Sequence, residues 1–243
     1  MIQNTIYSSI LKSKKKAEKK FALLVDPDKF DSKETIRLAE SASVDFIMVG
    51  GSLISNGNFE KCIGVIKSQT SIPVIIFPGN YLQISKNADA VLLLSLISGR
   101  NPEFLIGQHV VGAPAIKSSG LEVLPTGYML IESGKQTSAS YMSNTSPIPS
   151  EKYDIAACTA MAGEQLGLKL IYLDAGSGAK QVVNQEMILK VSQSVSIPII
   201  VGGGINTSKK AIEACKAGAD IIVVGNAIEK DNSIIKSISL AIH

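Results

Sequence analysis

Residues 198–227 read PIIVGGGINTSKKAIEACKAGADIIVVGNA, and this stretch decides the fold of the chain. Two short apolar runs, Pro198 to Val201 and Asp220 to Val224, each lead into glycine and enclose a segment with helical periodicity. Neither run alternates between apolar and polar residues, which is typical of parallel strands that are buried on both faces. Gly218 would end the helix between them. The stretch therefore predicts a strand, a helix and a second strand of one parallel sheet.

Similar runs recur through the rest of the chain, with helical segments between them. The eight predicted strands cover residues 21–26, 45–49, 73–77, 90–94, 127–131, 169–173, 198–201 and 220–224. Eight such units in 243 residues fit a (β/α)8 TIM barrel, whose typical size is about 250 residues. An open doubly wound sheet usually has fewer strands and a glycine fingerprint after the first, whereas the first strand here ends in Asp26-Pro-Asp28. We therefore expect one (β/α)8 barrel domain that spans residues 1–243.

Two connections depart from the regular pattern. Only about a dozen residues, 78–89, lie between the third and fourth strands, and a full crossover helix hardly fits there. We predict a truncated or missing third helix, which would leave a gap in the outer ring. Residues 132–149, in contrast, form a long segment rich in Ser, Thr, Asn, Gly and Pro. Such a loop is either a lid over a binding site or a mobile surface excursion.

Composition and charge exclude several classes of protein. The chain is 45% hydrophobic with a net charge of +3, which is too weak a basic balance to indicate nucleic acid as a partner. Its three cysteines are scattered, so we expect neither a disulfide framework nor a zinc site, and a reduced, cytoplasmic protein. No apolar run approaches the roughly 20 residues that span a bilayer. Six lysines crowd residues 12–20 and predict a solvated helix face, with contact to an anionic membrane as the alternative.

The active site of such a barrel lies at the carboxyl ends of its strands. The seventh strand ends in Gly202-Gly203-Gly204 and the eighth in Gly225-Asn226. Residues without side chains let backbone N–H groups approach a phosphate closely, and the loops after these two strands often hold one in this fold. The two glycine sites therefore predict a phosphate site, and tight turns alone are the alternative.

Carboxylates follow two other strands. Asp174 ends the sixth strand with Ser177 close behind it, and either accepts a proton or binds hydroxyl groups, unless it only caps the next loop. Asp26 follows the first strand, and Ser52 follows the second. One or two carboxylates with hydroxyl or water oxygens suit a hard divalent cation that binds phosphates. Asp26 and Ser52 therefore predict a metal site, although Asp-Pro-Asp is also a common turn.

Several chemistries lack the residues they require. Neither His109 nor His243 lies at a predicted strand end beside a carboxylate, and His109 is expected in a helix or the core. No lysine falls inside a predicted strand at the rim, which disfavours Schiff-base chemistry. The sequence has no Walker loop, zinc motif or nucleophile elbow. What remains is a phosphate site, a divalent cation and a carboxylate, which suits a reaction driven by ionisation of an electrophile and by positioning.

Together these motifs resemble the geranylgeranylglyceryl phosphate synthase family, the prenyltransferases that form the first ether bond of archaeal-type lipids. The resemblance spans nearly the whole chain and is closest to the larger of the family's two groups. The matching segments are Val25 to Lys29, Val49 to Ser52, Gly127 to Glu132, Ser140 to Thr145, Pro147 to Pro149, Tyr172 to Ala179, Gly202 to Ile205 and Val224 to Ala227.

The resemblance implies sn-glycerol 1-phosphate as acceptor, a polyprenyl (geranylgeranyl) diphosphate as donor, release of diphosphate, Mg2+ as cofactor and a homo-oligomer. It implies Asp26 and Asp174 as catalytic residues, with Asp26 and Ser52 coordinating the ion. The implied acceptor-binding residues are Tyr172, Leu173, Asp174, Ala175, Gly176, Ser177, Gly178, Gly203, Gly204, Gly225 and Asn226. The family usually has glutamate where this chain has Asp174, so the carboxylate here is one methylene shorter.

The donor's tail needs an apolar environment, and the gap at the missing helix is the predicted place for it. Residues 78–82 and 92–97 border this gap. The candidate tail contacts are Leu93, Leu94, Leu96 and Ile97, which would otherwise be ordinary core residues. A lipid substrate would also fit a weak peripheral membrane contact of the basic N-terminal segment.

Two other functions share the predicted phosphate site. One is an isomerase or lyase that acts on a small sugar or indole phosphate, which would need a catalytic Lys, Glu or His at the rim. The other is a barrel that binds a phosphorylated flavin or a similar cofactor without turnover. Release of diphosphate that requires both glycerol phosphate and a prenyl donor would distinguish the three.

Overall fold

Eight parallel strands close into a barrel in the computed structural model of the chain, which describes residues 6–30, 33–56 and 58–243. The strands are β1 (Lys20–Val25), β2 (Phe46–Val49), β3 (Val74–Ile76), β4 (Ala90–Leu96), β5 (Glu122–Leu130), β6 (Leu170–Asp174), β7 (Ile199–Gly202) and β8 (Ile221–Val224). They are hydrogen-bonded in sequence order, and β8 pairs with β1 to complete the ring. The predicted (β/α)8 barrel is confirmed.

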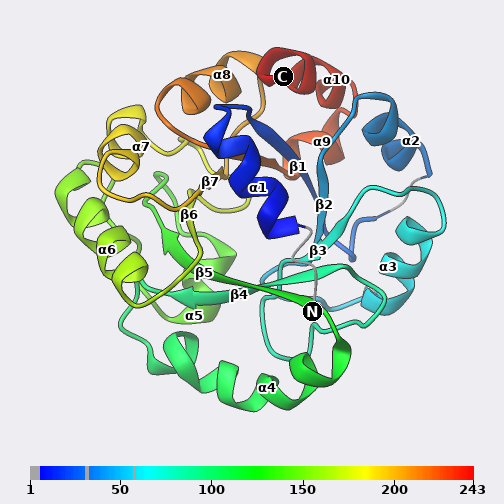
Figure 1. The fold of residues 1–243 in the computed structure, drawn as a ribbon, viewed down its shortest axis with the longest axis horizontal. Coiled ribbons are helices and arrows are strands. Elements are labelled where there is room, and N and C mark those ends of the chain that lie inside the picture. The colour runs from blue at the N-terminus through cyan, green and yellow to red at the C-terminus, as the bar shows by residue number, and fades with distance from the viewer. Residues whose placement is uncertain (1–5, 31–32, 57) are drawn as a thin grey trace.

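Helices surround the barrel (Figure 1). They are α1 (Ile6–Lys15), α2 (Lys33–Ser41), α3 (Phe59–Lys67), the π-helix η1 (Glu103–Gly107), α4 (Gln108–Ser119), α5 (Ser138–Ser143), α6 (Tyr153–Gln165), α7 (Gln185–Ser192), α8 (Ser208–Lys216), α9 (Asn226–Lys230) and α10 (Ile234–Ile242). Helix α8 begins after Thr207, whose hydroxyl accepts a hydrogen bond from the backbone of Lys210. It ends before Gly218, which has a φ of +118° and marks the end of this helix as predicted.

The strands are apolar on both faces because both faces are buried. In β2, Phe46 and Met48 belong to the core inside the barrel, whereas Ile47 and Val49 belong to the core between the barrel and its helices. Side chains of a strand alternate between its two faces, so a continuous apolar run fills both cores. This explains why the strands were recognisable without a polar alternation.

The predicted gap in the helical ring is confirmed. Residues 77–89 connect β3 to β4 through turns and contain no helix. The long segment 132–149 is predicted as either a lid or a mobile surface excursion, and the structure shows ordered elements in it. It contains α5, which starts with a capping box formed by Thr137 and Ser140, and Ile148 pairs with Ile131 beside β5. Two reciprocal capping bonds and a buried isoleucine order the segment.

Three aspartates secure the amino-terminal end of the barrel in the same way. Each precedes one strand and accepts a hydrogen bond from a backbone N–H of the preceding strand. The three bonds are Phe21 N to Asp45 Oδ2 at 2.8 Å, Val74 N to Asp89 Oδ2 at 2.7 Å and Ile199 N to Asp220 Oδ2 at 2.9 Å. Each carboxylate also pairs with a lysine, which is Lys20, Lys67 and Lys14 respectively.

Replacement of Asp220 by alanine is expected to lower the free energy of unfolding by about 2–3 kcal/mol, because the buried N–H of Ile199 loses its acceptor. Replacement of Lys14 by methionine removes only the ion pair and is expected to cost about 1 kcal/mol or less. Denaturant unfolding of both variants measures the difference. Equal losses would contradict the assignment of the larger effect to the backbone hydrogen bond.

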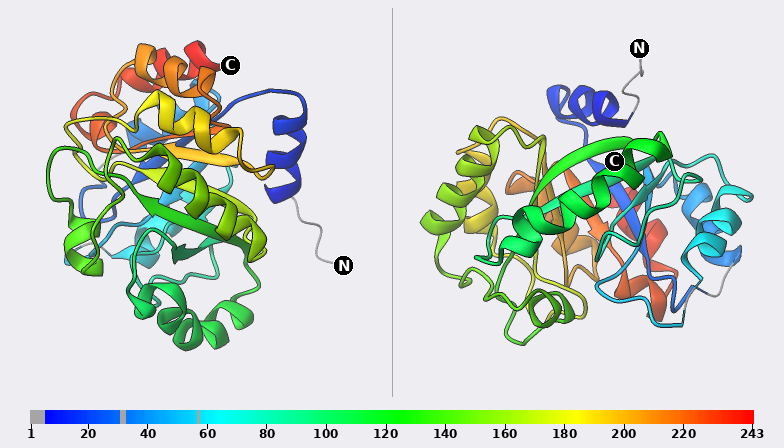
Figure 2. Two further views of the ribbon diagram at one scale, coloured as in Figure 1. Left: turned by 90° about the vertical axis from the view of Figure 1, so that its left-hand side faces the viewer. Right: turned by 90° about the horizontal axis from the view of Figure 1, so that it is seen from below.

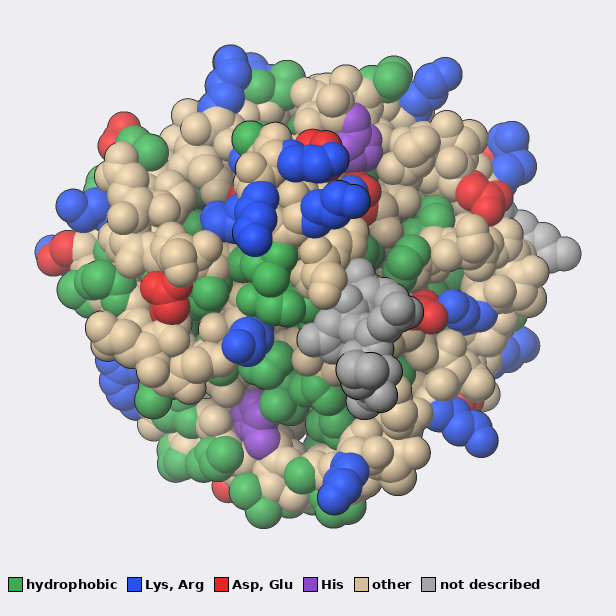
Figure 3. Space-filling model, in the orientation of Figure 1, with side chains coloured by type: hydrophobic (Ala, Val, Ile, Leu, Met, Phe, Trp, Pro, Cys, Tyr) green, Lys and Arg blue, Asp and Glu red, His purple; other side chains and the backbone are tan. Residues whose placement is uncertain are grey.

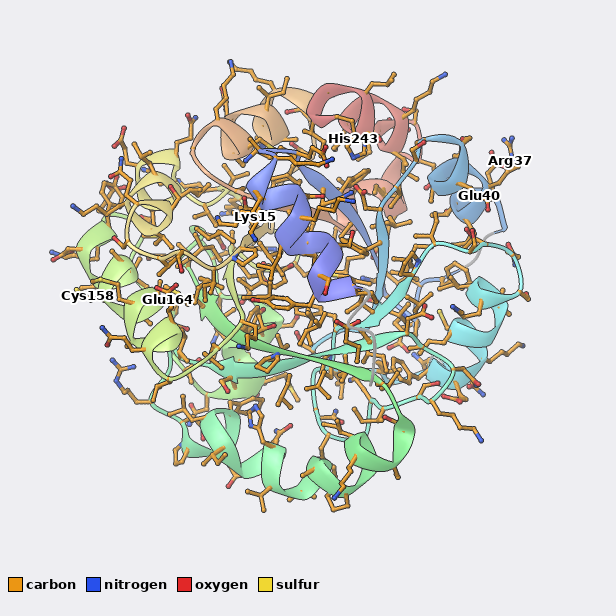
Figure 4. The ribbon with its side chains drawn as sticks, viewed as in Figure 1. Lys15, Arg37, Glu40, Cys158, Glu164 and His243 are labelled. Carbon is orange, nitrogen blue, oxygen red and sulfur yellow. The ribbon has the colours of Figure 1, made fainter. Side chains whose placement is uncertain are left out.

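Helix α1 covers this amino-terminal end, as Figure 2 shows. The backbone N–H groups of Ile6 and Tyr7 donate to the carboxylate of Glu122 at 3.0 and 2.9 Å, and Ile6 and Ile10 are buried in the core inside the barrel. Basic side chains gather over and beside α1 in Figure 3, and Lys15, labelled beside α1 in Figure 4, is exposed. The basic segment therefore lies at the end opposite the carboxyl ends of the strands. In the described part of the chain, no helix has the length and apolar character needed to cross a bilayer.

Candidate active site

A cavity of about 510 Å³ opens at the carboxyl ends of the strands, which we call the mouth. The predicted residues that line it are Asp26, Ser52, Tyr172, Asp174, Gly176, Ser177, Gly178, Gly203, Gly204, Gly225 and Asn226. Two further predicted residues, Leu173 and Ala175, do not line it and are instead buried among the helices. Alternation along β6 turns Tyr172 and Asp174 inward and the other two outward. Only the backbone of Leu173 and Ala175 could therefore reach the acceptor, and the binding role given to these two residues stays a prediction.

Glycines bring the loops of the mouth into close contact. Gly203 has a φ of +84°, and a Cβ atom there would lie 2.6 Å from the backbone nitrogen of Gly176. A Cβ atom on Gly202 would lie 2.5 Å from the hydroxyl oxygen of Tyr172. No other residue type fits either position without displacing backbone or ring atoms. The mouth is therefore lined at Gly176, Gly203 and Gly204 by backbone without side chains, which suits an anion such as phosphate.

Asp174 is held by two hydrogen bonds at the inner end of the mouth. Its Oδ2 accepts a bond of 2.5 Å from the hydroxyl of Tyr128, and its Oδ1 accepts one of 2.7 Å from the backbone N–H of Gly176. The carboxylate is 7% exposed. Burial raises the pKa of Asp174 above its ordinary value, although both hydrogen bonds oppose the rise. A buried carboxylate with a raised pKa accepts a proton more readily than an exposed one, which suits a general base.

Tyr128, which bonds to this carboxylate, belongs to a cluster of three aromatic rings. Phe77 stacks on Tyr172 with ring centroids 5.4 Å apart, and Tyr128 meets both rings edge to face. Phe77 and Tyr128 had no assigned role in the sequence analysis. The sequence offered one indication of a role for Tyr128. It lies inside a predicted strand, where a buried hydroxyl group needs a polar partner.

Asp26 lies at the outer part of the mouth. Its Oδ1 accepts a hydrogen bond from the backbone of Asp28, and its Oδ2 lies 2.9 Å from Nζ of Lys29. Burial lowers the pKa of Lys29, but hydrogen bonds and charge from Asp26 and Glu229 outweigh this and raise it, so the ammonium group stays charged at neutral pH. Asp28 itself accepts bonds from Ser55 and the backbone of Asn56, and holds that loop.

The donor set fits a Mg2+ ion that is held largely by a substrate. Within the described ranges, no group of three or more His, Cys, Asp or Glu residues is arranged to hold a metal. Asp26 and Ser52 line the same cavity, and a Cβ atom on Gly51 would lie 3.8 Å from Oδ1 of Asp26, so the second loop passes close to the carboxylate. Mg2+ commonly uses one or two carboxylates and completes its coordination with phosphate and water oxygens.

An apolar groove runs from the mouth into the gap left by the missing helix. Its cavity has a volume of about 110 Å³ and lies between β4 and the helices η1 and α4, where Figure 3 shows a hollow among hydrophobic side chains. The groove and the mouth share five lining residues, which are Gly51, Ser52, Phe77, Tyr128 and Ala139. The two spaces therefore adjoin and share one wall.

The predicted tail contacts are found in this groove with one exception. Leu93, Leu94 and Leu96 line it, but Ile97 does not, because its side chain packs beneath Gly127 and Gly163 on the other side. His109 lies on α4, as expected of a helix residue, and its Nε2 is 3.3 Å from the hydroxyl oxygen of Ser95. Burial lowers the pKa of His109, which favours the neutral imidazole in the groove wall.

The chain is similar in sequence and structure to several known proteins. A family model described as the PcrB family matches residues 14–242. The geranylgeranylglyceryl phosphate synthase of Chitinophaga pinensis is 55% identical over 100% of this chain and 97% of its own length. The protein of the same name from Thermococcus kodakarensis is 44% identical over 90% of this chain and 88% of its own length. The crystal structure of (S)-3-O-geranylgeranylglyceryl phosphate synthase from Thermoplasma acidophilum, in complex with substrate sn-glycerol-1-phosphate, is 32% identical with a TM-score of 0.91, and each chain is 98% covered.

Proposed function

Because the chain belongs to the PcrB family, we propose that its mouth joins sn-glycerol 1-phosphate to a prenyl diphosphate. The protein is a prenyltransferase that forms geranylgeranylglyceryl phosphate, as its relatives with this name and fold do. It makes an ether bond between the acceptor hydroxyl and C1 of the prenyl chain and releases diphosphate.

The position of an apolar groove directly beside a polar mouth is the observation that carries this function. Phe77 and Tyr128 lie where the two spaces meet. A prenyl diphosphate has a charged head and a long apolar tail, and it needs both environments side by side. A barrel that isomerises a small sugar phosphate or binds a phosphorylated cofactor has no use for a groove of this kind.

The acceptor binds by its phosphate and is oriented by its hydroxyl. The backbone around Gly203, Gly204 and Gly225 holds the phosphate, and Ser177 and Asn226 add side-chain contacts from the same rim. This places the glycerol hydroxyl toward Asp174. Fixing both ends of a small molecule removes much of the entropy cost of reaching a reactive geometry.

The donor binds with its diphosphate at Asp26 and Ser52 and its tail in the groove. Mg2+ bound there would stabilise the negative charge that grows on the departing diphosphate. Asp26 anchors this end of the donor, while the apolar groove walls exclude water from the tail. Allylic C1 then lies between the two subsites, beside Tyr128 and Phe77.

The transfer itself breaks the bond between C1 and the diphosphate oxygen and forms the bond between C1 and the acceptor oxygen. Diphosphate leaves with the electron pair of the broken bond. Asp174 accepts the proton of the acceptor hydroxyl late in the reaction, since an electrophile with carbocation character needs only a weakly activated nucleophile. Phe77 and Tyr128 line both spaces, so their ring electrons are placed to stabilise the positive charge that develops at C1.

The product assay with a ladder of prenyl diphosphates tests this function. Mass detection of the ether product is expected only when glycerol 1-phosphate and a prenyl donor are both present, and chelation of divalent cations is expected to stop it. The mirror-image acceptor, sn-glycerol 3-phosphate, is the control for recognition of the acceptor. Absence of an ether product with every donor length would overturn the proposal.

Replacement of Leu94 by tryptophan is expected to shorten the longest accepted donor, because Leu94 lines the groove. Filling part of an apolar cavity excludes the methylene groups that occupied it, each of which contributes about 0.8 kcal/mol when buried. The ladder assay measures the shift in preferred chain length. Ile97, which lies outside the groove, provides the control: an Ile97→Leu variant keeps the wild-type preference. A Leu94 variant with an unchanged preference would contradict the placement of the tail.

We also propose that the protein is a homo-oligomer, on the family resemblance alone. A peripheral membrane contact through the basic N-terminal segment would turn the covered end of the barrel, and not the mouth, toward the lipid surface.

A further inference from the structure

A series of polar contacts crosses the mouth and joins three of its loops. Nζ of Lys29 lies 2.9 Å from Oδ2 of Asp26 and 3.4 Å from Oε2 of Glu229. Nδ2 of Asn226 donates to the same Glu229 oxygen at 3.3 Å, and the hydroxyl of Ser177 donates to Oδ1 of Asn226 at 2.5 Å. The series therefore begins at the residue that anchors the donor and ends at the loops that hold the acceptor phosphate.

The charged residues around the mouth show why these polar contacts matter for the binding of anions. The charged residues that line it, within the described chain, are Asp26, Asp174, Glu229, Asp231, Lys29 and Lys230. Four carboxylates and two lysines give an acidic lining, although both substrates of the proposed reaction are anions. A carboxylate close to a bound phosphate weakens its binding unless a cation compensates for it.

Glu229 has a clear structural reason to be there and a clear electrostatic cost. By accepting from Nδ2 of Asn226, it fixes the orientation of that amide, so that the amide oxygen faces Ser177. The same contact places the negative charge of Glu229 directly beside Asn226, a residue of the proposed acceptor phosphate site. Lys29 is the cation that contacts Glu229 in the described structure.

We propose that Lys29 and Glu229 form a positioning pair, in which Lys29 neutralises Glu229 so that Glu229 can orient Asn226 without repelling the acceptor phosphate. An ammonium group has three N–H donors, so Lys29 can leave Asp26 when a cation and the donor occupy it, and still keep its contact with Glu229. Neither residue takes part in bond making. Both act through Asn226 and the phosphate loops, and the proposal rests on the proposed function of the mouth.

Acceptor binding measured without donor or divalent cation tests this pair. In titration calorimetry, Lys29→Met is expected to weaken the affinity for sn-glycerol 1-phosphate about three- to fivefold, the range of a partly exposed charge interaction. Glu229→Gln keeps an oxygen for Asn226 and removes the charge. The double variant Lys29→Met/Glu229→Gln is therefore expected to return to within about twofold of the wild-type affinity.

The matched control is Lys230→Met, which removes the other lysine of the mouth, one that forms no ion pair within the described residues. Any loss of affinity for sn-glycerol 1-phosphate in Lys230→Met is not expected to recover when Glu229→Gln is added. Equal affinity of Lys29→Met and wild type, failure of the double variant to recover, or an equal rescue of Lys230→Met would each overturn the pair. If the wild-type protein itself does not bind sn-glycerol 1-phosphate, the proposed function fails and this inference fails with it.

Discussion

Replacement of Asp26 by alanine is expected to reduce the rate of ether formation by at least about a thousandfold, with little change in the unfolding temperature. Asp26 is the carboxylate proposed to anchor the donor's diphosphate and its Mg2+, so the variant loses stabilisation of the charge that grows on the leaving group. The side chain is half-buried and its ion pair with Lys29 is partly exposed, so its removal affects stability little. Product detection by mass and thermal unfolding measure the two effects.

The control for this prediction is Asp154→Ala, which removes an exposed carboxylate from α6 in the outer ring. This variant is expected to keep wild-type activity. Near-normal turnover of Asp26→Ala, with the acceptor bound normally, would contradict the assignment of Asp26 to the donor and its cation.

The second large effect is expected at Asp174. Replacement by asparagine removes the carboxylate that we propose as the proton acceptor, and is expected to lower kcat by about a hundred- to ten-thousandfold. Asparagine has nearly the same shape, and its oxygen can still accept from the backbone of Gly176. The variant Asp174→Glu restores a carboxylate and is expected to keep far more activity than Asp174→Asn. Equal losses in the two variants would mean that shape, and not the carboxylate, is what the reaction requires.

The raised pKa of Asp174 determines how activity depends on pH and how Asp174→Asn changes the stability of the fold. As the proposed base, Asp174 must be ionised to accept the proton, and its ionised fraction falls as the pH drops through the raised pKa. Activity is therefore expected to fall on the acidic side at a higher pH than an exposed aspartate would give. The hydrogen bond from Tyr128 lowers the pKa of Asp174. The variant Tyr128→Phe is therefore expected to move the acidic side of the pH–activity profile to still higher pH. The folded protein holds this proton more tightly than the unfolded chain, and ionisation above the raised pKa costs folding free energy. Asp174→Asn is therefore expected to be as stable as wild type or more stable at neutral pH.

The sequence was sufficient for the barrel and for the gap in its ring, because both follow from local patterns. Apolar runs identify strands buried on both faces, and the short segment 78–89 cannot hold a crossover helix. Helix α5 was missed because its capping box, Thr137 and Ser140, lies within a segment whose composition is typical of loops.

The candidate site was predictable only where residues follow strands directly. Asp26, Asp174 and the glycines of the last two strands fall into this class. The bond between Tyr128 and Asp174 and the pair of Lys29 and Glu229 join residues 46 and 200 positions apart. Such contacts depend on which side chains a closed barrel turns inward, and periodicity along the chain does not determine their partners.

The absence of a helix between β3 and β4 bears on how the product departs. A lipid tail enclosed by a complete ring of helices would have to be withdrawn along its length, and the phosphate would have to leave the glycine loops in the same movement. A groove that lacks a helix on one side would let the tail separate sideways while the headgroup is still held. Departure of a long product can then proceed in two smaller steps, and release limits turnover in many enzymes.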